Sequence, residues 1–169
     1  LIVMGTKEAH DPLERFMGTH AAEVIDASNV PVLMIPGQQS IFDVHKIGYA
    51  TDSRSVLNTN RLGYLAAIAE MLQAKVEVFF VASDGASVDF ENSENKKVMD
   101  RFFESVDHAY VNVEESSKKQ GILNHVKEGE IGLLAMIPRQ HGKVFTWIHG
   151  DTTQYMAQHL SVPLLTLPD

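Results

Sequence analysis

The chain has 169 residues, no cysteine and a formal net charge of -8 at pH 7. Without cysteine it has no disulfide framework, thiolate zinc site or cysteine nucleophile, and no apolar run approaches the roughly 20 residues of a membrane-spanning helix. The acidic balance disfavours nucleic-acid and anionic-membrane partners, because both normally require a concentrated basic surface. These features predict a soluble globular protein of about one domain.

Seven short apolar runs recur along the chain. They are residues 1–4, 30–35, 46–51, 75–82, 109–113, 131–137 and 162–167. Most are nearly continuous in apolar residues, which is typical of strands buried on both faces of a parallel sheet; buried helix segments are the alternative interpretation. Helical-period segments separate most of the runs, and this alternation predicts an α/β fold with helices on both faces of the sheet.

The segments between these runs predict five helices. The first begins at Asp11-Pro12-Leu13-Glu14, which supplies an N-cap acceptor, a proline at the first helical position and a glutamate at the third. Ser53 or Ser55 caps the second, whose apolar stripe extends to Leu72. The predicted spans are about 11–27, 53 or 55 to 72, 94–107, 117–127 and about 143–159. Residues 83–95 are polar and contain glycine and serine, which predicts a surface loop.

An internal repeat determines the predicted domain organisation. Residues 1–36 and residues 133–168 each contain a strand, a polar connection, a helix and a closing strand with a Val-Pro pair. Each copy also places a glycine, Gly18 or Gly150, at the same distance before its closing strand. We therefore interpret residues 1–36 as the last third of one domain, 37–43 as a linker and 44–169 as a complete five-stranded domain.

Three stretches carry a resemblance to a known family. They are Leu1-Ile2-Val3-Met4-Gly5-Thr6 with Leu13-Glu14-Arg15-Phe16-Met17-Gly18-Thr19, the strand end Tyr49-Ala50-Thr51-Asp52-Ser53, and the two closing strands. In these stretches the chain resembles the universal stress proteins, specifically a tandem member whose first domain is truncated. The resemblance implies an open, doubly wound, flavodoxin- or Rossmann-like parallel sheet of five strands in the order 3-2-1-4-5, with a strand-helix-strand remnant of a second copy. It also implies a ligand crevice between strands one and four.

ATP-binding members of this family have a glycine, two residues, a second glycine, nine residues, and then glycine with serine or threonine. Such small residues let the backbone N–H groups approach phosphates closely. In the first copy Gly5, Gly18 and Thr19 match, whereas Glu8 replaces the second glycine. A carboxylate there would repel a triphosphate by roughly 1–4 kcal/mol at 4 Å unless it turned to solvent. The resemblance therefore implies ATP as a ligand of an intact first domain, through an incomplete motif.

The second copy departs further from the nucleotide motif. Its four motif positions are Ile137, Gln140, Gly150 and Asp151, of which only the glycine matches. Asp52 matches the aspartate that holds the adenosine end in the family, although an aspartate after a strand also caps a following helix. We therefore expect the second domain to be degenerate for ATP.

The sequence identifies no catalytic or metal site. It contains no HExxH pair, serine elbow, P-loop or dinucleotide-binding glycine motif. Arg139, His141 and Lys143 would attract an anion in the altered second loop, which leaves an enzyme acting on a small anion as a minor alternative. A charged surface loop is the simpler interpretation.

Together these features predict a cytoplasmic, non-catalytic regulatory or binding protein of the stress response. We expect it to self-associate as a dimer through the closing strands 30–35 and 162–167, because apolar edge strands left bare promote aggregation. No nucleic-acid or membrane partner is expected. The alternative function is ATP binding through the first domain, with weak ATP hydrolysis.

Overall fold

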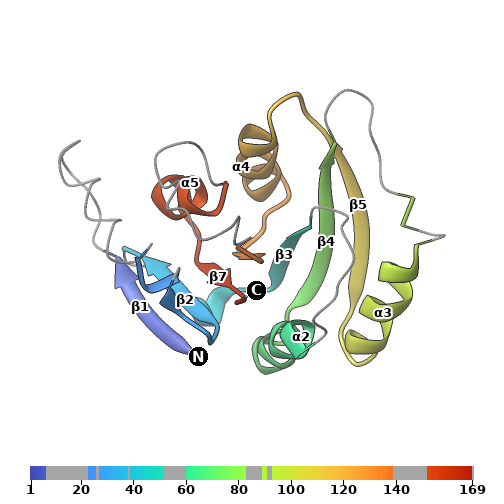
Figure 1. The fold of residues 1–169 in the computed structure, drawn as a ribbon, viewed down its shortest axis with the longest axis horizontal. Coiled ribbons are helices and arrows are strands. Elements are labelled where there is room, and N and C mark those ends of the chain that lie inside the picture. The colour runs from blue at the N-terminus through green and yellow to red at the C-terminus, as the bar shows by residue number, and fades with distance from the viewer. Residues whose placement is uncertain are drawn as a thin grey trace.

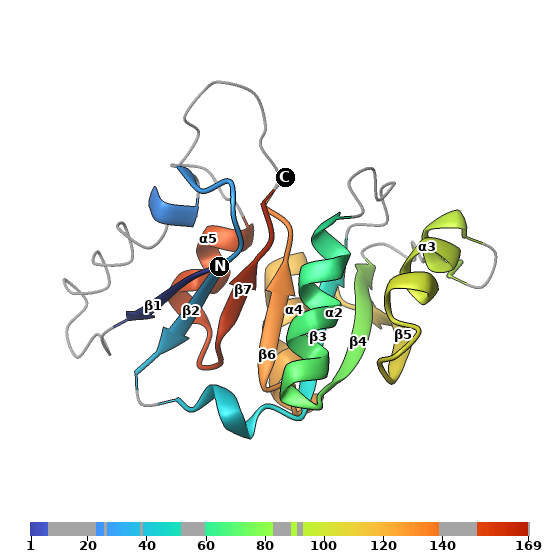
Figure 2. The same cartoon turned by 90° about the horizontal axis from the view of Figure 1, so that it is seen from below.

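The computed structural model describes residues 1–6, 23–25, 27–37, 39–51, 60–82, 89–90, 93–138 and 152–168. In this part of the chain, seven strands form one sheet in the order β1-β2-β7-β6-β3-β4-β5 (Figures 1 and 2). They are β1 (Ile2–Thr6), β2 (Val32–Pro36), β3 (Lys46–Thr51), β4 (Lys75–Ala82), β5 (His108–Glu114), β6 (Leu133–Met136) and β7 (Leu164–Thr166). Each predicted apolar run corresponds to one strand, so the prediction of strands at these places is confirmed.

Residues 44–169 contribute five adjacent strands. Their order β5-β4-β3-β6-β7 is the order 3-2-1-4-5 that the resemblance implies. Helices α2 (Asn60–Leu72) and α3 (Glu94–Phe102) cover one face of the sheet, while α4 (Lys118–Glu128) and α5 (Thr152–His159) cover the other (Figure 1). The sheet therefore has the doubly wound α/β arrangement predicted from the sequence.

Helix α3 is shorter than the predicted span of 94–107. It ends because the Phe103 N–H closes the last turn on the Met99 carbonyl, and the Val106 N–H then bonds the Phe103 carbonyl. Phe103 and Val106 are both buried, although they follow the helix. The predicted span rested on Val98, Phe102 and Val106, which are four residues apart, and this spacing continues to Val106 although the helical backbone ends at Phe102.

The other helices begin or end close to the predicted positions. Ser117 caps α4 by accepting a hydrogen bond from the Gln120 N–H, and this helix matches the predicted span within a residue. Residues 23–25 and 27 are helical, in agreement with the end of the first predicted helix. The predicted starts of the first, second and fifth helices lie outside the described residues.

The internal repeat is present in the strand register. The first three β1–β2 pairs become the three β6–β7 pairs when both residue numbers are raised by 132, as Ile2–Val32 becomes Leu134–Leu164. The antiparallel β2–β7 seam obeys the same rule, because Leu33 pairs with Leu165 at its centre. The pairs β1–β2 and β6–β7 are therefore related by a pseudo-two-fold axis that passes through this seam.

The two closing strands do not lie at the edge of the sheet, which corrects the expectation of self-association through residues 30–35 and 162–167. Strand β2 lies between β1 and β7, and β7 lies between β2 and β6, so both edges of both strands are already paired. The edges of the described sheet are β1 and β5. Within this chain, each closing strand is the antiparallel partner of the other.

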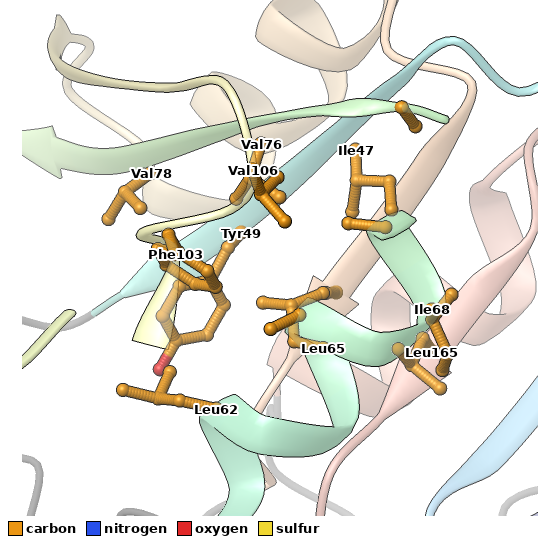
Figure 3. Close-up of a cluster of buried hydrophobic side chains, with 14 of the residues drawn as sticks. Ile47, Tyr49, Leu62, Leu65, Ile68, Val76, Val78, Phe103, Val106 and Leu165 are labelled. Atoms are coloured by element: carbon orange, nitrogen blue, oxygen red, sulfur yellow. The ribbon is translucent and has the colours of Figure 1, made fainter. Parts of the chain in front are cut away.

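Two apolar cores hold the helices to the sheet. The core under α2 and α3 includes Ile47 of β3, Leu62 and Leu65 of α2, and Phe103 after α3 (Figure 3). The core on the opposite face lies under α4 and α5 and includes Met156. Each fully buried side chain of this size contributes roughly 1.5–3 kcal/mol to folding. This packing holds the strands in place, and in open α/β sheets ligands bind at the carboxyl ends of the strands.

Candidate functional site

Strands β3 and β6 form the topological switch point of the sheet. They are adjacent and parallel, with Ala50 opposite Met136, and the neighbouring strands β4 and β7 extend the sheet in opposite directions. Their carboxyl ends, at Thr51 and after Met136, therefore lie side by side. Open α/β sheets bind ligands at this place, so the structure locates the candidate ligand site of residues 44–169 here.

Two of the predicted site residues, Gly5 and Ile137, fall within the described part of the chain. Those that lie outside it are Glu8, Gly18, Thr19, Asp52, Gln140, Gly150 and Asp151, together with Arg139, His141 and Lys143. Their grouping around a ligand stays a prediction.

Gly5 lies in β1, opposite Ile35 of β2. A Cβ atom built on Gly5 would meet no heavy atom of the described residues within 4 Å, and the backbone here does not adopt a positive φ. Neither packing in the described structure nor backbone conformation thus requires a glycine at this position. Open space beside the backbone suits the close approach of a ligand, which is the role implied by the resemblance.

Ile137 occupies the equivalent position of the second copy, because raising 5 by 132 gives 137. It follows β6, is half-buried and packs against the core under α2. A branched apolar side chain therefore stands beside the switch point at the position where the first copy has a glycine. This is the clearest chemical difference between the two copies among the described residues.

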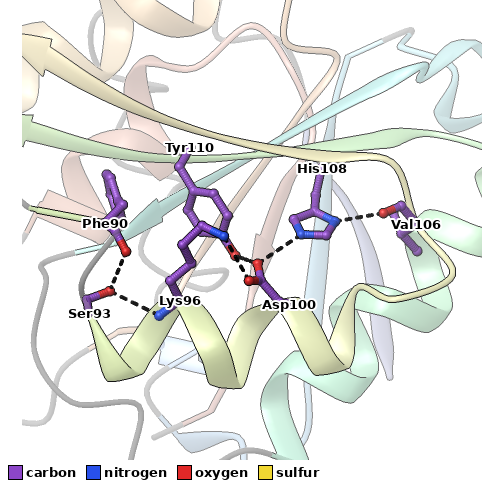
Figure 4. Close-up of polar contacts among 7 residues, drawn as sticks. All are labelled: Phe90, Ser93, Lys96, Asp100, Val106, His108 and Tyr110. Atoms are coloured by element: carbon purple, nitrogen blue, oxygen red, sulfur yellow. Dashed lines mark hydrogen bonds and ion pairs between the residues drawn. The ribbon is translucent and has the colours of Figure 1, made fainter.

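A polar cluster joins α3 to the edge strand β5; we call Lys96, Asp100, His108 and Tyr110 the Asp100 cluster (Figure 4). Lys96 Nζ lies 2.8 Å from Asp100 Oδ2, while the Tyr110 hydroxyl donates to Asp100 Oδ1 at 2.7 Å. His108 Nε2 lies 3.1 Å from the same Oδ1, and its Nδ1 lies 2.9 Å from the Val106 carbonyl oxygen. The cluster connects one helix to one strand at several points.

The ionisation of the Asp100 cluster follows from these contacts. Burial alone would raise the pKa of Asp100, but hydrogen bonds from Lys96, Tyr110 and His108 outweigh it and lower the pKa to about 2. Burial raises the pKa of Tyr110, and the hydrogen bond to the Asp100 carboxylate raises it further. An ionised carboxylate with three donors and a neutral phenol suit the attachment of α3 to β5 better than proton transfer at neutral pH.

A second polar cluster, which we call the Glu77 cluster, consists of Lys46, Glu77 and His125. Lys46 Nζ lies 2.7 Å from Glu77 Oε2, and His125 Nε2 lies 2.7 Å from Glu77 Oε1. Burial alone would raise the pKa of Glu77, but the hydrogen bonds from Lys46 and His125 lower it. Lys46 is the first residue of β3, so this cluster lies at the opposite end of the strand from the switch point. It connects β3, β4 and α4 rather than lining the ligand site.

Neither cluster was predicted from the sequence. Part of the Asp100 cluster has a local signal, because Lys96 and Asp100 are four residues apart on one helix and His108 and Tyr110 share one face of a strand. The Glu77 cluster has no local signal, since its members come from three distant elements. Among the described residues, no group of three or more histidine, aspartate or glutamate side chains is arranged to hold a metal ion. No helix in the described part of the chain is both long enough and apolar enough to cross a membrane.

The sequence has no match among protein-family models or among curated proteins. Solved structures do match. A universal stress protein from Archaeoglobus fulgidus DSM 4304 aligns with a TM-score of 0.70 at 20% identity, over 99% of this chain and 60% of that chain. A protein described as a putative universal stress protein from Pseudomonas aeruginosa UCBPP-PA14 aligns with a TM-score of 0.65 at 14% identity, over 98% of this chain and 63% of that chain.

A universal stress protein solved in complex with cAMP aligns with a TM-score of 0.61 at 14% identity. It covers 74% of this chain and 97% of its own length. The present chain thus spans only 60% and 63% of the two structures that cover nearly all of it. Together these likenesses show that the chain has the universal stress protein fold.

Proposed function

We propose that the chain belongs to a non-catalytic regulatory or binding protein of the universal stress type, which acts in the cytoplasm. The observation that carries this proposal is the universal stress fold together with the pseudo-two-fold repeat, in which strands β1 and β2 have the register of strands β6 and β7. The structure solved with cAMP supports a small-molecule ligand of the nucleotide class for this fold. The catalytic motifs missing from the sequence support binding over turnover.

The proposed units are residues 1–36, which correspond to the closing part of one universal stress domain, and residues 44–169, which form a second. The shared register of β1–β2 and β6–β7 supports this division. Residues 37–43 connect the units: Gly37 has a φ of 51°, and the short helix η2 (Ile41–Asp43) leaves Phe42 83% exposed. In this arrangement the second unit pairs with the first through the β2–β7 seam and supports it.

We further propose that residues 44–169 do not bind ATP. The phosphate loop of this fold needs small residues where the backbone approaches the ligand, whereas this unit has Ile137 packed against the core at the first position. Asp151 would place a carboxylate where the family offers a hydroxyl, and burying like charges together is costly. The support for this proposal is therefore the side-chain chemistry of the altered loop.

The alternative function is ATP binding by the first copy through Gly5, Gly18 and Thr19, with weak hydrolysis. The observation in its favour is the open space beside Gly5, where a ligand can approach the backbone. Glu8 counts against it, because its carboxylate repels phosphate groups.

Calorimetric titration of the whole chain with ATP and magnesium tests both functions. We expect no saturable heat up to about millimolar nucleotide, which corresponds to a binding free energy weaker than about -4 kcal/mol. If heat is saturable, Gly5→Val identifies its source. This variant adds bulk in open space at an exposed strand position, so it blocks the first copy without disturbing the packing seen in the structure.

The Gly5→Val and Ile137→Ala variants distinguish which copy binds the nucleotide. Saturable binding that Gly5→Val removes establishes the alternative function in the first copy. Saturable binding that survives Gly5→Val but changes in Ile137→Ala contradicts the proposal that residues 44–169 are degenerate for ATP.

A further inference from the structure

His108 in the Asp100 cluster and His125 in the Glu77 cluster need different numbers of ring protons to make their hydrogen bonds. In the Asp100 cluster, both ring nitrogens of His108 face an acceptor: Nδ1 faces the Val106 carbonyl oxygen at 2.9 Å and Nε2 faces Asp100 Oδ1 at 3.1 Å (Figure 4). A carbonyl oxygen only accepts, and so does an ionised carboxylate. Both contacts are therefore hydrogen bonds only when both ring nitrogens carry protons.

We propose that α3 is held on β5 by a protonation-dependent clamp, in which doubly protonated His108 bridges Asp100 and the Val106 carbonyl and loosens α3 when it loses a proton. A neutral imidazole keeps one N–H and presents a lone pair at the other nitrogen. Whichever tautomer forms, one of the two contacts then places two acceptors against each other. The positive charge that faces the Asp100 carboxylate is lost at the same time.

The surroundings of His108 determine the sign of this effect. From α3, Asp100 contacts the ring, and Lys96 bonds the other oxygen of the same carboxylate. From β5, the Tyr110 hydroxyl shares Oδ1 with His108. The ring of Phe103, after α3, lies 5.6 Å from the His108 ring between centroids, and the α2 side chain Glu70 accepts a hydrogen bond from Ser105. The charged group in direct contact with His108 is thus the Asp100 carboxylate.

Asp100 remains ionised throughout the range in which histidine changes charge. Its pKa is about 2, because burial is outweighed by its three hydrogen bonds, whereas histidine side chains ordinarily titrate between about pH 5 and 8. Raising the pH through that range therefore leaves the Asp100 carboxylate unchanged as an acceptor, whereas the clamp needs both ring protons of His108. The clamp weakens as the pH rises.

His125 in the Glu77 cluster provides a contrast within the same molecule. Its Nε2 lies 2.7 Å from Glu77 Oε1, and its ring makes no other hydrogen bond among the described residues. A neutral ring with its proton on Nε2 satisfies that contact. The attachment of α4 to β4 should therefore persist when the histidines lose their charge, unlike the attachment of α3 to β5.

Helix α3 is suited to respond to so small a change. It has nine residues, and isolated helices shorter than about 12–15 residues are marginal in water. Its attachment to the sheet thus decides whether it forms. Loosening it uncovers Met99 and the neighbouring Phe103, which are buried at the end of the core under α2 and α3.

Hydrogen exchange of the whole chain between pH 5 and pH 8 tests the proposal. After correction for the intrinsic pH dependence of exchange, we expect the protection of residues 94–102 to fall about three- to tenfold, as expected for losing one partly exposed charge-assisted hydrogen bond. Protection of residues 118–128 in α4 should not change. In His108→Gln, whose side chain is uncharged at every pH, the protection of α3 should not depend on pH.

His125→Gln is the matched control and should retain the wild-type pH response of α3. If His108→Gln does not fold, the 15N resonances of the wild-type His108 ring report directly whether both nitrogens carry protons at pH 5. Constant protection of α3 in the wild type, a pH response that persists in His108→Gln, or a singly protonated ring at pH 5 would each overturn the proposal.

Discussion

The strand pairs β1–β2 and β6–β7 follow the same path and occupy different environments. Both have the same parallel register, and both join the antiparallel seam at Leu33 and Leu165. Strand β6 is covered by β3 and by helices on both faces, so Leu134 is 0% exposed, whereas its equivalent Ile2 in β1 is 38% exposed. The repeat therefore determines the path of these strands, while the neighbouring elements determine their burial and side-chain chemistry.

Replacing equivalent strand residues should give the largest difference between the copies. Leu134→Ala removes a fully buried side chain and should lower the free energy of unfolding by about 2–5 kcal/mol, because a cavity adds to the lost transfer energy. Ile2→Ala removes a side chain already in contact with water and should lower it by less than about 1 kcal/mol. Urea denaturation of both variants measures the difference. Equal losses would mean that β1 is buried to the same extent as β6.

Substitutions at the first position of the nucleotide motif, Ile137 and Gly5, should give a smaller difference in the free energy of unfolding. The larger loss is again expected in the second copy. Ile137→Ala removes part of a half-buried side chain from the core under α2 and should cost about 1–2 kcal/mol. Gly5→Ala adds a methyl group in open space and should change the free energy of unfolding by less than about 0.5 kcal/mol. The midpoints of thermal and urea unfolding check both values. A large loss of stability in Gly5→Ala would mean that other residues fill the space beside Gly5.

The two edge strands of the sheet also differ, because the Asp100 cluster joins β5 to α3. The pH dependence of stability tests the contribution of this cluster. The folded-state pKa of Asp100 is about 2, below its ordinary value of 3.8. The folded state therefore binds this proton less readily than the unfolded state, and the stabilisation is complete above about pH 4 and lost as the pH falls toward 2. Because the carboxylate is partly exposed, we expect less than about 1 kcal/mol.

Urea denaturation at several pH values between 2.5 and 6 measures this effect in the wild type and in Asp100→Asn. The variant should lose less stability than the wild type as the pH falls through this range. Parallel pH profiles for the two proteins would remove Asp100 as a source of acid sensitivity.

The other edge, formed by β1, should respond to charge with the smallest change in stability. Val3 is 58% exposed, so Val3→Lys should change the free energy of unfolding by less than about 0.5 kcal/mol. It should reduce aggregation, because a lysine on an edge strand opposes pairing with another chain. Light scattering during concentration measures aggregation, and Lys75→Arg in the interior strand β4 is a control that keeps its charge. Unchanged aggregation would indicate that β1 is not the surface through which molecules associate.

Much of the fold could be predicted because its signals are local. Continuous apolar runs identified β3 and β4 to the residue, since strands buried on both faces tolerate few polar side chains. The end of α3 was overestimated, because Val106 continues the fourfold apolar spacing of Val98 and Phe102 after the backbone has turned. The prediction that the closing strands pair between molecules was also wrong, because they pair with each other within the chain. A strand that pairs within its own chain has the same apolar sequence as one that pairs between molecules.

The candidate site was less predictable, for a physical reason. Ile137 could be identified as a departure from a glycine motif, yet the packing of its side chain against the core under α2 depends on contacts distant in sequence. The Glu77 cluster joins Lys46 to His125 through a carboxylate on a third element, and no sequence spacing specifies that geometry. Local patterns predict elements, whereas polar networks between elements require the fold.

A disulfide introduced across the β2–β7 seam tests whether the two strand pairs meet there within one molecule. The chain has no cysteine of its own, so the double variant Leu33→Cys with Leu165→Cys reports one pairing. Directly opposed residues of antiparallel strands have Cα separations within the range of a disulfide. The control Val3→Cys with Leu165→Cys places the two thiols on strands separated by β2. If β2 and β7 pair within one chain, we expect an intramolecular disulfide in the first variant and none in the control. A disulfide formed only between two molecules, or equally in both variants, would contradict this pairing.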